Sequence, residues 1–403
     1  MSLIVKKFGG TSVADATCIR RVAGIITDAY REGNQVVVVL SAQGDTTDDL
    51  IEKAKEINPN ASAREMDMLL STGEQISVAL CAMAIEKMGY PVISLTGRQA
   101  GIITNTRSMN ARIKRIDTER IRAELDSRRI VIVTGFQGFD RNDNITTLGR
   151  GGSDTSAVAL AAALHADLCQ IYTDVDGVYT ADPRIVKTAR KLDEVTYNEM
   201  LELATLGAQV LHNRSVELAK KYNVNLEVLS SFSGHPGTKV KEATKKMEKT
   251  YISSVAKDTD IARLALLGVP NETGTSFKVF ELLARYGINV DIILQGIGHE
   301  GRKDICFTVA KKDLEKAKEL LEEQKDRIQY GELETNDDVA KVSVVGAGMI
   351  GSPGVAAKLF EALYDAGINI NMISTSEIKI SVLVDRKNAD AAVQAIHDKF
   401  FPM

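Results

Sequence analysis

Short apolar runs rich in β-branched residues alternate with longer helical patterns over residues 1–235 of this chain of 403 residues. This alternation is typical of α/β domains, in which helices cover both faces of a mostly parallel sheet. Ligands bind in such folds beyond the carboxyl ends of the strands, so the residues that follow each run are the first candidates for a functional site. The expected strands are Leu3–Phe8, Val36–Leu40, Val92–Ser94, Ile130–Thr134 and Leu168–Thr173.

An internal repeat follows, in which matching residues stand 80 positions apart. Each copy reads as a strand, a glycine turn, an amphipathic helix, a Gly-Ile-Asn turn and two further strands, which predicts a βαββ module. Two modules this small bury more apolar surface together than either does alone. The matching positions are Gly274 and Gly354, Lys278 and Lys358, Phe280-Glu281 and Phe360-Glu361, and Gly287-Ile288-Asn289 and Gly367-Ile368-Asn369.

Glycine, proline and many lysine residues break the pattern after residue 233 and predict a solvated linker. We therefore expect a catalytic domain over residues 1–235, a linker over 236–260, and the two modules over 261–335 and 336–403. The alternative is that the C-terminal end of the second module completes the first.

Composition indicates an ordinary soluble protein, with 44% hydrophobic residues, 26% charged residues and a net charge of −4. The chain lacks the basic excess of a nucleic-acid-binding protein, the apolar core of a signal peptide and an apolar run of the ~18 residues that span a membrane. We therefore expect a cytoplasmic protein with a small-molecule partner and no nucleic-acid or membrane partner. No zinc site or disulfide framework is expected, because four cysteines are widely scattered: Cys18, Cys81, Cys169 and Cys306.

The first candidate site is Lys7-Phe8-Gly9-Gly10-Thr11-Ser12, which joins a strand to a helical stretch with Ser12 as the candidate N-cap. Its glycines let backbone N–H groups approach an anion, and Lys7 adds a positive charge. Turns of this kind are also common as purely structural connections in α/β proteins.

The second candidate site is Leu148–Ser156, which runs into an apolar helix that Ser153 or Asp154 can cap. Its three glycines leave backbone exposed to a ligand. The planar guanidinium of Arg150 suits a carboxylate or a phosphate, and the alternative is a surface arginine in a flexible loop.

Two polar segments after the second strand are weaker candidates. Ser41–Thr47 offers hydroxyls and small residues that could line a substrate pocket. Glu74, in Ser71-Thr72-Gly73-Glu74, either takes part in a site or only favours the N-terminus of the helix that follows.

The loop Tyr172–Arg184 follows an apolar strand and offers acids, an aromatic side chain and a base, as a nucleotide platform requires. A calcium loop is excluded, because Asp174, Asp176 and Asp182 lack EF-hand spacing and no glutamate follows at the twelfth position.

The segment Gly346–Gly351 matches the dinucleotide fingerprint G-x-G-x-x-G. Too few residues follow it to build a two-half nucleotide fold, and Gly348 corresponds to Gly268 in the repeat. We therefore interpret it as a turn of the second module.

Taken in order, four motifs closely resemble the aspartate kinase family over nearly the whole chain: Lys7–Ser12, Ser71–Glu74, Gly149–Asp154 and Tyr172–Gly177. The repeat resembles the paired ACT domains that follow the kinase domain in monofunctional members. The resemblance implies the amino-acid-kinase fold and transfer of phosphate from ATP to L-aspartate, the first step of lysine, threonine and methionine biosynthesis. Because the acceptor is already a carboxylate, the chemistry depends on positioning and charge neutralisation, with Mg²⁺ bridging the ATP phosphates.

The family match also implies roles for individual residues. Lys7 would steady the transferring phosphoryl group and Asp154 would organise the lysine, while Arg150 would bind the α-carboxylate of aspartate and Glu74 its ammonium. The implied substrate-binding residues are Ser41, Thr47, Glu74, Arg150, Gly151, Gly152 and Ser153. The implied nucleotide-binding residues are Lys7, Gly9, Gly10, Ser12, Thr173, Asp174, Tyr179, Arg184 and Gln209.

The resemblance further implies inhibition by lysine, alone or with threonine, at sites where modules of different chains meet. The residues expected to flank these sites are Gly274, Asn289, Asp291, Gln295, Asn369 and Ile370. We expect at least a homodimer, because βαββ modules leave sheet edges that pairing would cover. Met247 resembles the internal start from which some relatives make a separate small subunit.

The chain departs from the family pattern at Gln209, where lysine is frequent, and at Asn213 and Thr273, where proline is frequent. One alternative is a kinase of the same fold for glutamate or acetylglutamate, because a single methylene changes binding by only about 1–3 kcal/mol. Another is a catalytically silent amino-acid-binding regulator, against which the presence of Lys7 and Asp154 argues.

Overall fold

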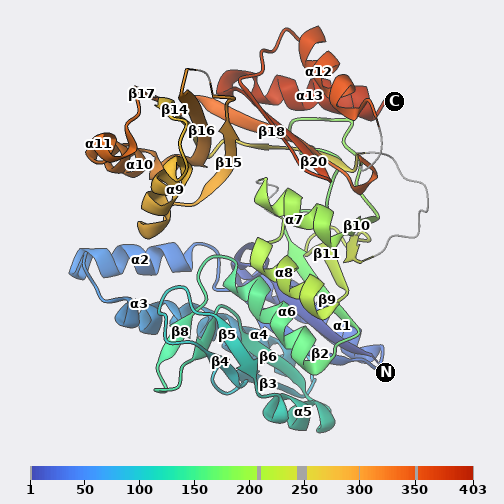
Figure 1. Ribbon diagram of the computed structural model, residues 1–403. Helices are drawn as coiled ribbons and strands as arrows, with labels where there is room; N and C mark the ends of the chain where they lie inside the picture. The colour runs from blue at the N-terminus through green and yellow to red at the C-terminus, as the bar shows by residue number, and fades with distance from the viewer. Residues whose placement is uncertain (1, 207–209, 243–251, 299, 350–352, 403) are drawn as a thin grey trace. The chain divides into compact units, whose positions relative to one another are not determined.

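The computed structural model describes residues 2–206, 210–242, 252–298, 300–349 and 353–402, which form two compact units (Figure 1). The first unit contains residues 2–179, 191–205 and 210–242. The second contains residues 180–190, Leu206 and the described residues from 252 onward. Gln209 and Met247 lie outside the described residues.

All five expected strands lie in one eight-stranded sheet, in the order β10-β12-β11-β9-β1-β2-β6-β3. Its paired strands run parallel except for β11 and β12, which confirms the mostly parallel α/β class. The strands are β1 (Leu3–Phe8), β2 (Gln35–Leu40), β3 (Val92–Leu95), β6 (Ile130–Thr134), β9 (Leu168–Thr173), β10 (Glu194–Thr196), β11 (Leu226–Ser230) and β12 (Thr238–Lys241).

Helices cover both faces of this sheet. The helices α1 (Ala16–Arg31) and α4 (Thr72–Lys87) share an apolar cluster with Val36, Val38 and Leu40 of β2. Because side chains alternate along a strand, Val37 and Val39 point to the opposite face, where α6 (Gly152–Leu164) packs. The helix α8 (Asn213–Tyr222) packs on α6, and Figure 1 shows the two side by side.

A smaller sheet, in the order β5-β4-β7-β8, belongs to the same unit. The strand β8 leads directly into the glycine-rich segment that begins at Leu148, so this sheet supports one of the candidate sites. The remaining elements of the unit are β4 (Ile102–Thr104), β5 (Ile113–Ile116), β7 (Gln137–Phe139), β8 (Ile145–Thr147), α2 (Thr46–Ile57), α3 (Ala63–Leu70), α5 (Glu119–Asp126) and α7 (Tyr197–Thr205).

Two helix starts differ from the sequence expectation. Asp15 caps α1, because its carboxylate accepts hydrogen bonds from the N–H groups of Thr17 (2.7 Å) and Cys18 (2.8 Å). Ser12 is instead buried in a 3₁₀ turn. Gly151 is the N-cap of α6, so Ser153 and Asp154 lie within the first turn of that helix.

The helical stretch Ala63–Lys87, formed by α3 and α4, is long and apolar enough to cross a membrane by length and composition. Core helices of soluble proteins share these properties. Glu74, Ser77, Cys81 and Ile85 of this stretch are buried within the first unit, whereas Ile76, Leu80 and Met83 are exposed.

The second unit contains two four-stranded sheets, in the orders β15-β16-β14-β17 and β13-β18-β20-β19. The two copies of the repeat have the same order of strand, helix and two strands, as expected. The elements are β13 (Ser254–Asp258), β14 (Ile261–Pro270), α9 (Thr275–Arg285), β15 (Val290–Gln295), β16 (Arg302–Ala310), α10 (Leu314–Glu323), α11 (Lys325–Ile328), β17 (Glu332–Asn336), β18 (Val339–Val345), α12 (Val355–Asp365), β19 (Met372–Thr375), β20 (Lys379–Asp385) and α13 (Ala389–Phe400).

The fourth strand of the second sheet comes from an unexpected place. The strand β17 pairs with β14 and completes the first module, whereas β13, which precedes the first module, pairs with β18 of the second. The first module is therefore inserted between two strands of the second. The range 236–260, expected as a linker, contains β12 of the large sheet and β13.

The segment Thr180–Arg190 groups with the second unit, although its sequence neighbours belong to the first. Ala181 and Val186 are buried in the apolar cluster of the second module. Tyr179 and Lys191, which flank the segment, form an isolated β-bridge within the first unit. The loop expected to bind nucleotide is thus divided between the two units.

A buried lysine joins the two modules. Lys341 on β18 is 2% exposed and contacts the carboxylate of Asp291 on β15. The carboxylate of Asp258 on β13 lies 3.6 Å from the same Nζ. Asp291 belongs to the sheet of the first module, whereas Lys341 and Asp258 belong to the sheet of the second, so this ion cluster connects the two modules.

Candidate active site

A buried ion pair lies at the carboxyl end of β1. Lys7 Nζ is 2.7 Å from Asp154 Oδ1, and the two residues are 8% and 9% exposed. Asp154 stands in the first turn of α6, which packs on β1. A Cβ atom on Gly9 would lie 3.5 Å from Lys7 Nζ, so the glycine turn lies directly beside the ammonium group. The structure therefore brings together the two residues expected to form the catalytic pair.

The glycine turn is held by contacts with two other strand ends. The Gly9 N–H donates to the Tyr172 carbonyl (3.3 Å), so this N–H is occupied and a phosphate contact would require that bond to open. A Cβ atom on Gly10 would lie 2.9 Å from the Ala42 carbonyl oxygen, which leaves room only for glycine. The Ser12 hydroxyl lies 2.8 Å from that of Ser231, in the buried interior.

Glu74 lies on the other side of the loop that follows β2. Its side chain is in the first turn of α4 and is 3% exposed. Oε1 accepts a hydrogen bond from the Ala42 N–H (3.3 Å), while Oε2 has no hydrogen-bond partner in the described part of the chain. Burial raises the pKa of Glu74 to about 8, against the lowering effect of its backbone hydrogen bonds. A desolvated carboxyl of this kind keeps its proton at neutral pH and ionises when a cationic group binds beside it, because a nearby positive charge lowers its pKa.

Ser41 and Thr47 stand on the same loop and at the start of α2, where each is half-buried. The Ser41 N–H donates to the Phe8 carbonyl (3.2 Å), which ties this loop to the end of β1. A Cβ atom on Gly73 would lie 2.8 Å from that of Ala42, so the loop is also in close contact with the N-terminus of α4. Glu74 and the glycine turn therefore flank one short loop.

The glycine-rich segment after β8 adopts a backbone that only glycine accommodates. Gly151 has φ +66°, and a Cβ atom there would lie 2.2 Å from the His212 ring. Arg150 is exposed just before it. Gly152 and Ser153 are buried at the start of α6, and the Ser153 Oγ lies 2.6 Å from the position of a Cβ atom on Gly135 at the end of β6.

Arg214, which supports this segment from α8, was not among the residues predicted from the sequence. Its Nη1 donates to the Leu148 carbonyl (2.8 Å) and its Nη2 to the Ala111 carbonyl (2.6 Å). The amphipathic pattern of this helix predicts that an arginine at this position faces solvent. Only the fold shows that Arg214 binds these two carbonyl groups.

The expected nucleotide residues are less closely grouped. Thr173 caps its own loop by accepting the Val175 N–H (3.1 Å), and Asp174 is exposed beside it. Tyr179 is half-buried at the end of the loop. Arg184 belongs to the second unit, where its guanidinium binds the carboxylate of Asp182 (2.8 Å).

A magnesium ion at this site would take most of its ligands from phosphate and water, as Mg²⁺ commonly does. Among the described residues, no group of three His, Cys, Asp or Glu side chains is spaced to hold a metal ion. Lys7 already neutralises Asp154, the acid of the buried pair. Phosphate oxygens of a bound nucleotide, together with water, would therefore supply the ligands of the ion.

The residues expected to bind effectors lie at equivalent places in the two modules. Gly274 is the N-cap of α9, and Asn289 and Asn369 are exposed before β15 and β19. Gln295 Oε1 accepts a hydrogen bond from the Ser276 hydroxyl (2.8 Å). Ile370 is half-buried, whereas Asp291 is already paired with Lys341.

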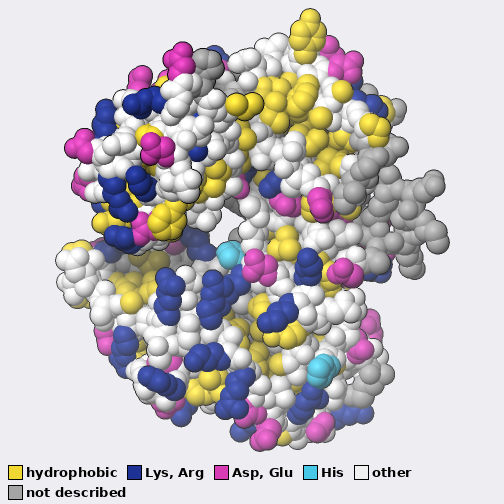
Figure 2. All heavy atoms as spheres, viewed as in Figure 1, with side chains coloured by type: hydrophobic (Ala, Val, Ile, Leu, Met, Phe, Trp, Pro, Cys, Tyr) yellow, Lys and Arg dark blue, Asp and Glu magenta, His cyan; other side chains and the backbone are white. Residues whose placement is uncertain are grey.

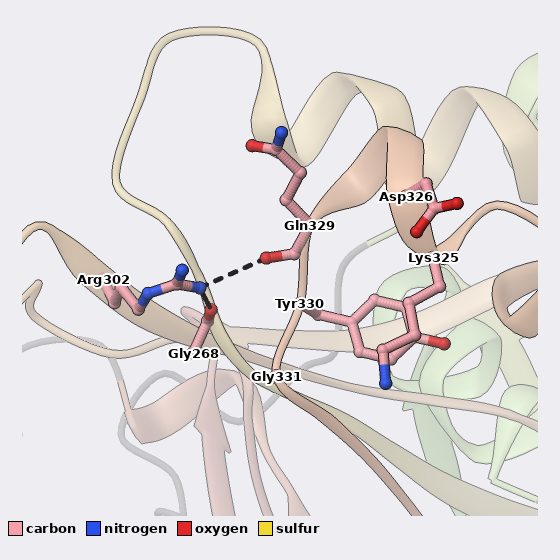
Figure 3. Close-up of a pocket in the computed structure, with 7 residues that line it drawn as sticks. All are labelled: Gly268, Arg302, Lys325, Asp326, Gln329, Tyr330 and Gly331. Carbon is pink, nitrogen blue, oxygen red and sulfur yellow. Dashed lines mark hydrogen bonds between the residues drawn. The ribbon is translucent and has the colours of Figure 1, made fainter.

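A separate open pocket of about 450 Å³ lies in the first module (Figure 3). Arg302 reaches across it to the carbonyl oxygens of Gly268 and Gln329, while Lys325 lies over the Tyr330 ring. None of the expected effector residues lines this pocket. Gly268 is the counterpart of Gly348, so the pocket occupies the position that the apparent dinucleotide motif has in the second module.

A mostly parallel α/β sheet with a buried lysine and carboxylate beside a glycine turn, followed by two βαββ modules, defines a regulated small-molecule kinase. The sequence profile of the amino acid kinase family matches residues 2–230, and that of the ACT domain matches residues 264–324 and 342–400. The chain belongs to the amino acid kinase family and, within it, to the aspartokinases with C-terminal ACT domains.

Similar proteins cover the full length of the chain. An aspartokinase of Bacillus sp. (strain MGA3) is 50% identical over 400 residues, which is 99% of this chain and 97% of that protein. The crystal structure of Escherichia coli aspartokinase III in complex with aspartate and ADP is 28% identical, with a TM-score of 0.82 over 99% of this chain and 100% of that one. The structure of the same enzyme with lysine and aspartate has a TM-score of 0.77 and 27% identity, over 100% of both chains.

Proposed function

We propose that the chain transfers the γ-phosphoryl group of ATP to the β-carboxylate of L-aspartate, giving ADP and 4-phospho-L-aspartate. The observation that carries this proposal is the arrangement around residues 41–44. The glycine turn beside the Lys7–Asp154 pair contacts that loop, where the Gly44 N–H donates to the Gly10 carbonyl (3.1 Å). Glu74 contacts the same loop through the Ala42 N–H and keeps its Oε2 without a partner among the described residues. A phosphate-binding group and an ammonium-binding group are thus held next to each other, as a two-substrate kinase requires.

Each charged side chain has a distinct task in this proposal. Lys7 neutralises charge on the transferring phosphoryl group, which spreads over its oxygens in the transition state. Asp154 holds the Lys7 ammonium in place at 2.7 Å. Glu74 binds the substrate ammonium and Arg150 its α-carboxylate, which leaves the β-carboxylate free to attack.

The remaining polar groups support the two substrates. Ser41, Thr47 and Ser153, with the backbone of Gly151 and Gly152, bind the other polar atoms of aspartate. Mg²⁺ bound to the ATP phosphates supplies further charge neutralisation. We assign the nucleotide to Gly10, Thr173, Asp174 and Tyr179. The same proposal includes further nucleotide contacts from Gly9, Ser12, Arg184 and Gln209.

Feedback inhibition by lysine, alone or with threonine, is the regulation that we propose for the paired ACT domains. The crystal structure of Escherichia coli aspartokinase III with lysine and aspartate supports it. Inhibition by these products would place the enzyme at the start of lysine, threonine and methionine biosynthesis, in the cytoplasm.

We also propose that the chain forms a homodimer or a higher oligomer. The strands β15 and β19 are the outer strands of their sheets, with Ile293, Leu294 and Ile373 exposed on them. Figure 2 shows hydrophobic side chains gathered on the surface of the second unit. Pairing with another copy would cover both the open edges and this apolar surface. A short subunit that starts at Met247 would be a variant of the same assembly.

A coupled assay of ADP release tests the activity. With ATP and Mg²⁺, aspartate should support turnover about ten- to a hundredfold better than glutamate or acetylglutamate, because Arg150 and Glu74 fix the distance between the two ends of the substrate. Equal turnover with glutamate would overturn the substrate assignment. Repeating the assay with lysine and threonine, singly and together, tests the regulation, and unchanged rates would refute it.

A further inference from the structure

Asp67 in α3 is a fully buried carboxylate to which the proposed chemistry gives no task. Its exposed fraction is 0%. Oδ1 accepts hydrogen bonds from the Thr147 hydroxyl (2.6 Å) and the Met109 N–H (3.0 Å). Oδ2 has no hydrogen-bond partner in the described part of the chain. Burying a half-satisfied carboxylate is unfavourable, and an apolar side chain would fill the same space without that cost.

Both hydrogen-bond partners of Asp67 lie beside the segment that carries Arg150. Thr147 is the last residue of β8, two positions before Gly149. The Met109 carbonyl oxygen lies 3.1 Å from the position of a Cβ atom on Gly149, and the Ala111 N–H donates to the Thr147 carbonyl (2.9 Å). Asp67 therefore fastens two adjoining backbone segments at the base of the Arg150 loop.

Arg214 holds the same two segments through their carbonyl groups. It donates to the Leu148 carbonyl and to the Ala111 carbonyl, at 2.8 and 2.6 Å. The backbone on either side of the Arg150 loop is thus held by Asp67 from α3 and by Arg214 from α8. Arg150 itself is exposed beyond the base of this loop, so its placement depends on these anchors.

The helical stretch that carries Asp67 also carries Glu74. The two residues are seven positions apart, Asp67 in α3 and Glu74 in the first turn of α4, and Ser71 joins the two helices. Glu74 Oε2 and Asp67 Oδ2 are both buried without a partner among the described residues. The joined helices α3 and α4 therefore carry both Glu74 and the acid that holds the base of the Arg150 loop.

We propose that Asp67 is a positioning residue that sets the Arg150 loop relative to Glu74, so that the consecutive helices α3 and α4 determine the length of amino acid that the site accepts. This inference rests on the proposed function, in which Arg150 and Glu74 bind the two charged ends of aspartate. Its physical basis is that effective catalysis needs both contacts at the correct separation.

Steady-state kinetics of three variants test the proposal. Asp67→Leu removes both hydrogen bonds to Oδ1, and Thr147→Val removes the one from the Thr147 hydroxyl. In both variants the KM for aspartate should rise, by about tenfold in Asp67→Leu, while the KM for ATP changes by less than about threefold. Asp67→Asn keeps an acceptor oxygen for both donors, so it should restore the KM for aspartate to within about threefold of the unsubstituted enzyme. Parallel increases in both KM values, or an Asp67→Asn variant as impaired as Asp67→Leu, would overturn the proposal.

Thr146→Val is the matched control, because Thr146 is an equally buried neighbour of Thr147 on β8. Its hydroxyl forms a hydrogen bond with that of Thr104 (2.6 Å) and is not a partner of Asp67. It should leave both KM values unchanged. If it raised the KM for aspartate as much as Thr147→Val, the effect would come from general loosening of β8, and the proposal would fail.

Amide hydrogen exchange separates this inference from the proposed function, because it needs no substrate. The amides of Met109–Ala111 and Thr147–Gly152 should exchange faster in Asp67→Leu and Thr147→Val than in the unsubstituted enzyme, with no change in β9. If aspartate is not a substrate but this pattern appears, the proposed function fails and the role of Asp67 in fixing the loop stands. Unchanged exchange in both variants would refute the positioning role whatever the substrate is.

Discussion

The Thr180 hydroxyl lies 2.9 Å from Nε2 of His397, a histidine of α13 with an exposed fraction of 0%. The same hydroxyl accepts the Arg190 N–H (3.0 Å), so one side chain joins both ends of the segment Thr180–Arg190 to the core of the second module. The ring of His397 stacks on Phe401, with 4.7 Å between the centroids. This contact fixes the continuation of the proposed nucleotide loop within the second unit.

Stability should depend on pH through this histidine. Burial lowers the pKa of His397 from its usual value of 6.5, and the nearby Asp398 opposes that shift only in part. The unfolded chain binds a proton at a pH where the folded chain does not, so the stabilisation is complete above pH 6.5 and is lost as the pH falls toward the folded pKa. Thermal unfolding between about pH 7.5 and pH 5.5 should show a larger decrease for the natural sequence than for His397→Phe, which keeps the ring but cannot titrate. Parallel decreases would contradict this assignment.

The opposite pH dependence is expected at Glu74. Its folded pKa of about 8 lies above the ordinary value of 4.5, so the folded state keeps the proton while the unfolded state loses it. The stability that this group contributes is therefore present below pH 4.5 and is lost as the pH rises to about 8. Glu74→Gln should stabilise the substrate-free protein by an amount that grows over this range, and it should weaken aspartate binding at least about tenfold. Thermal unfolding and the KM for aspartate measure the two effects, and a destabilised variant at pH 8 would contradict the first.

The buried pair of Lys7 and Asp154 should be needed for activity more than for substrate binding. Lys7→Met removes the charge that stabilises the transferring phosphoryl group, so kcat should fall at least about a hundredfold while the KM for aspartate changes little. Asp154→Asn leaves the Lys7 ammonium without its carboxylate and should lower kcat by a smaller factor. Steady-state assays of both variants check this order. A Lys7→Met variant with near-normal kcat would support the alternative of a regulator that binds amino acids without catalysis.

Sequence patterns predicted the parts of this site that follow strand ends. Lys7 lies at the end of β1 just before one glycine turn, and Asp154 lies in the first turn of α6 just after the other. The parallel pairing of β1 with β9, and the position of α6 before β9 in the sequence, bring these turns to one edge of the sheet. The repeat likewise predicted the strand, the helix and the two further strands of each copy, but not α10, α11, α13, β13 or β17. The predicted features depend on local periodicity and turn chemistry, which a single sequence displays.

Features that depend on long-range pairing could not be predicted. Nothing in the short run Ser254–Asp258 shows that it pairs with β18 across an inserted module. Asp67 and Arg214 have the helix positions of ordinary polar residues, and only the fold buries the first and aims the second at two carbonyl groups. The docking of Thr180–Arg190 in the second unit depends in the same way on Ala181 and Val186 meeting a distant core.

Arg150 should contribute mainly to aspartate recognition. Arg150→Ala leaves the substrate carboxylate without its guanidinium, at a cost of about 3–5 kcal/mol, and kcat/KM for aspartate should fall a hundredfold or more. Arg141→Ala, which removes another exposed arginine in a turn, is the control and should leave kcat/KM unchanged. If both variants behaved alike, Arg150 would be an ordinary surface residue.

The Lys341 cluster allows a test of the role of Asp291, which the family resemblance assigns to the effector site and the structure pairs with a buried lysine. Lys341→Met leaves Asp291 and Asp258 without their cation and should destabilise the second unit by about 3–5 kcal/mol. Adding Asp291→Asn to Lys341→Met should recover part of that loss, because one of the two uncompensated charges is then removed. Chemical denaturation of the single and double variants measures this coupling. An Asp291→Asn variant with unchanged stability but altered inhibition by lysine would instead assign Asp291 to effector binding, since a ligand contact outside the ion cluster would then carry its role.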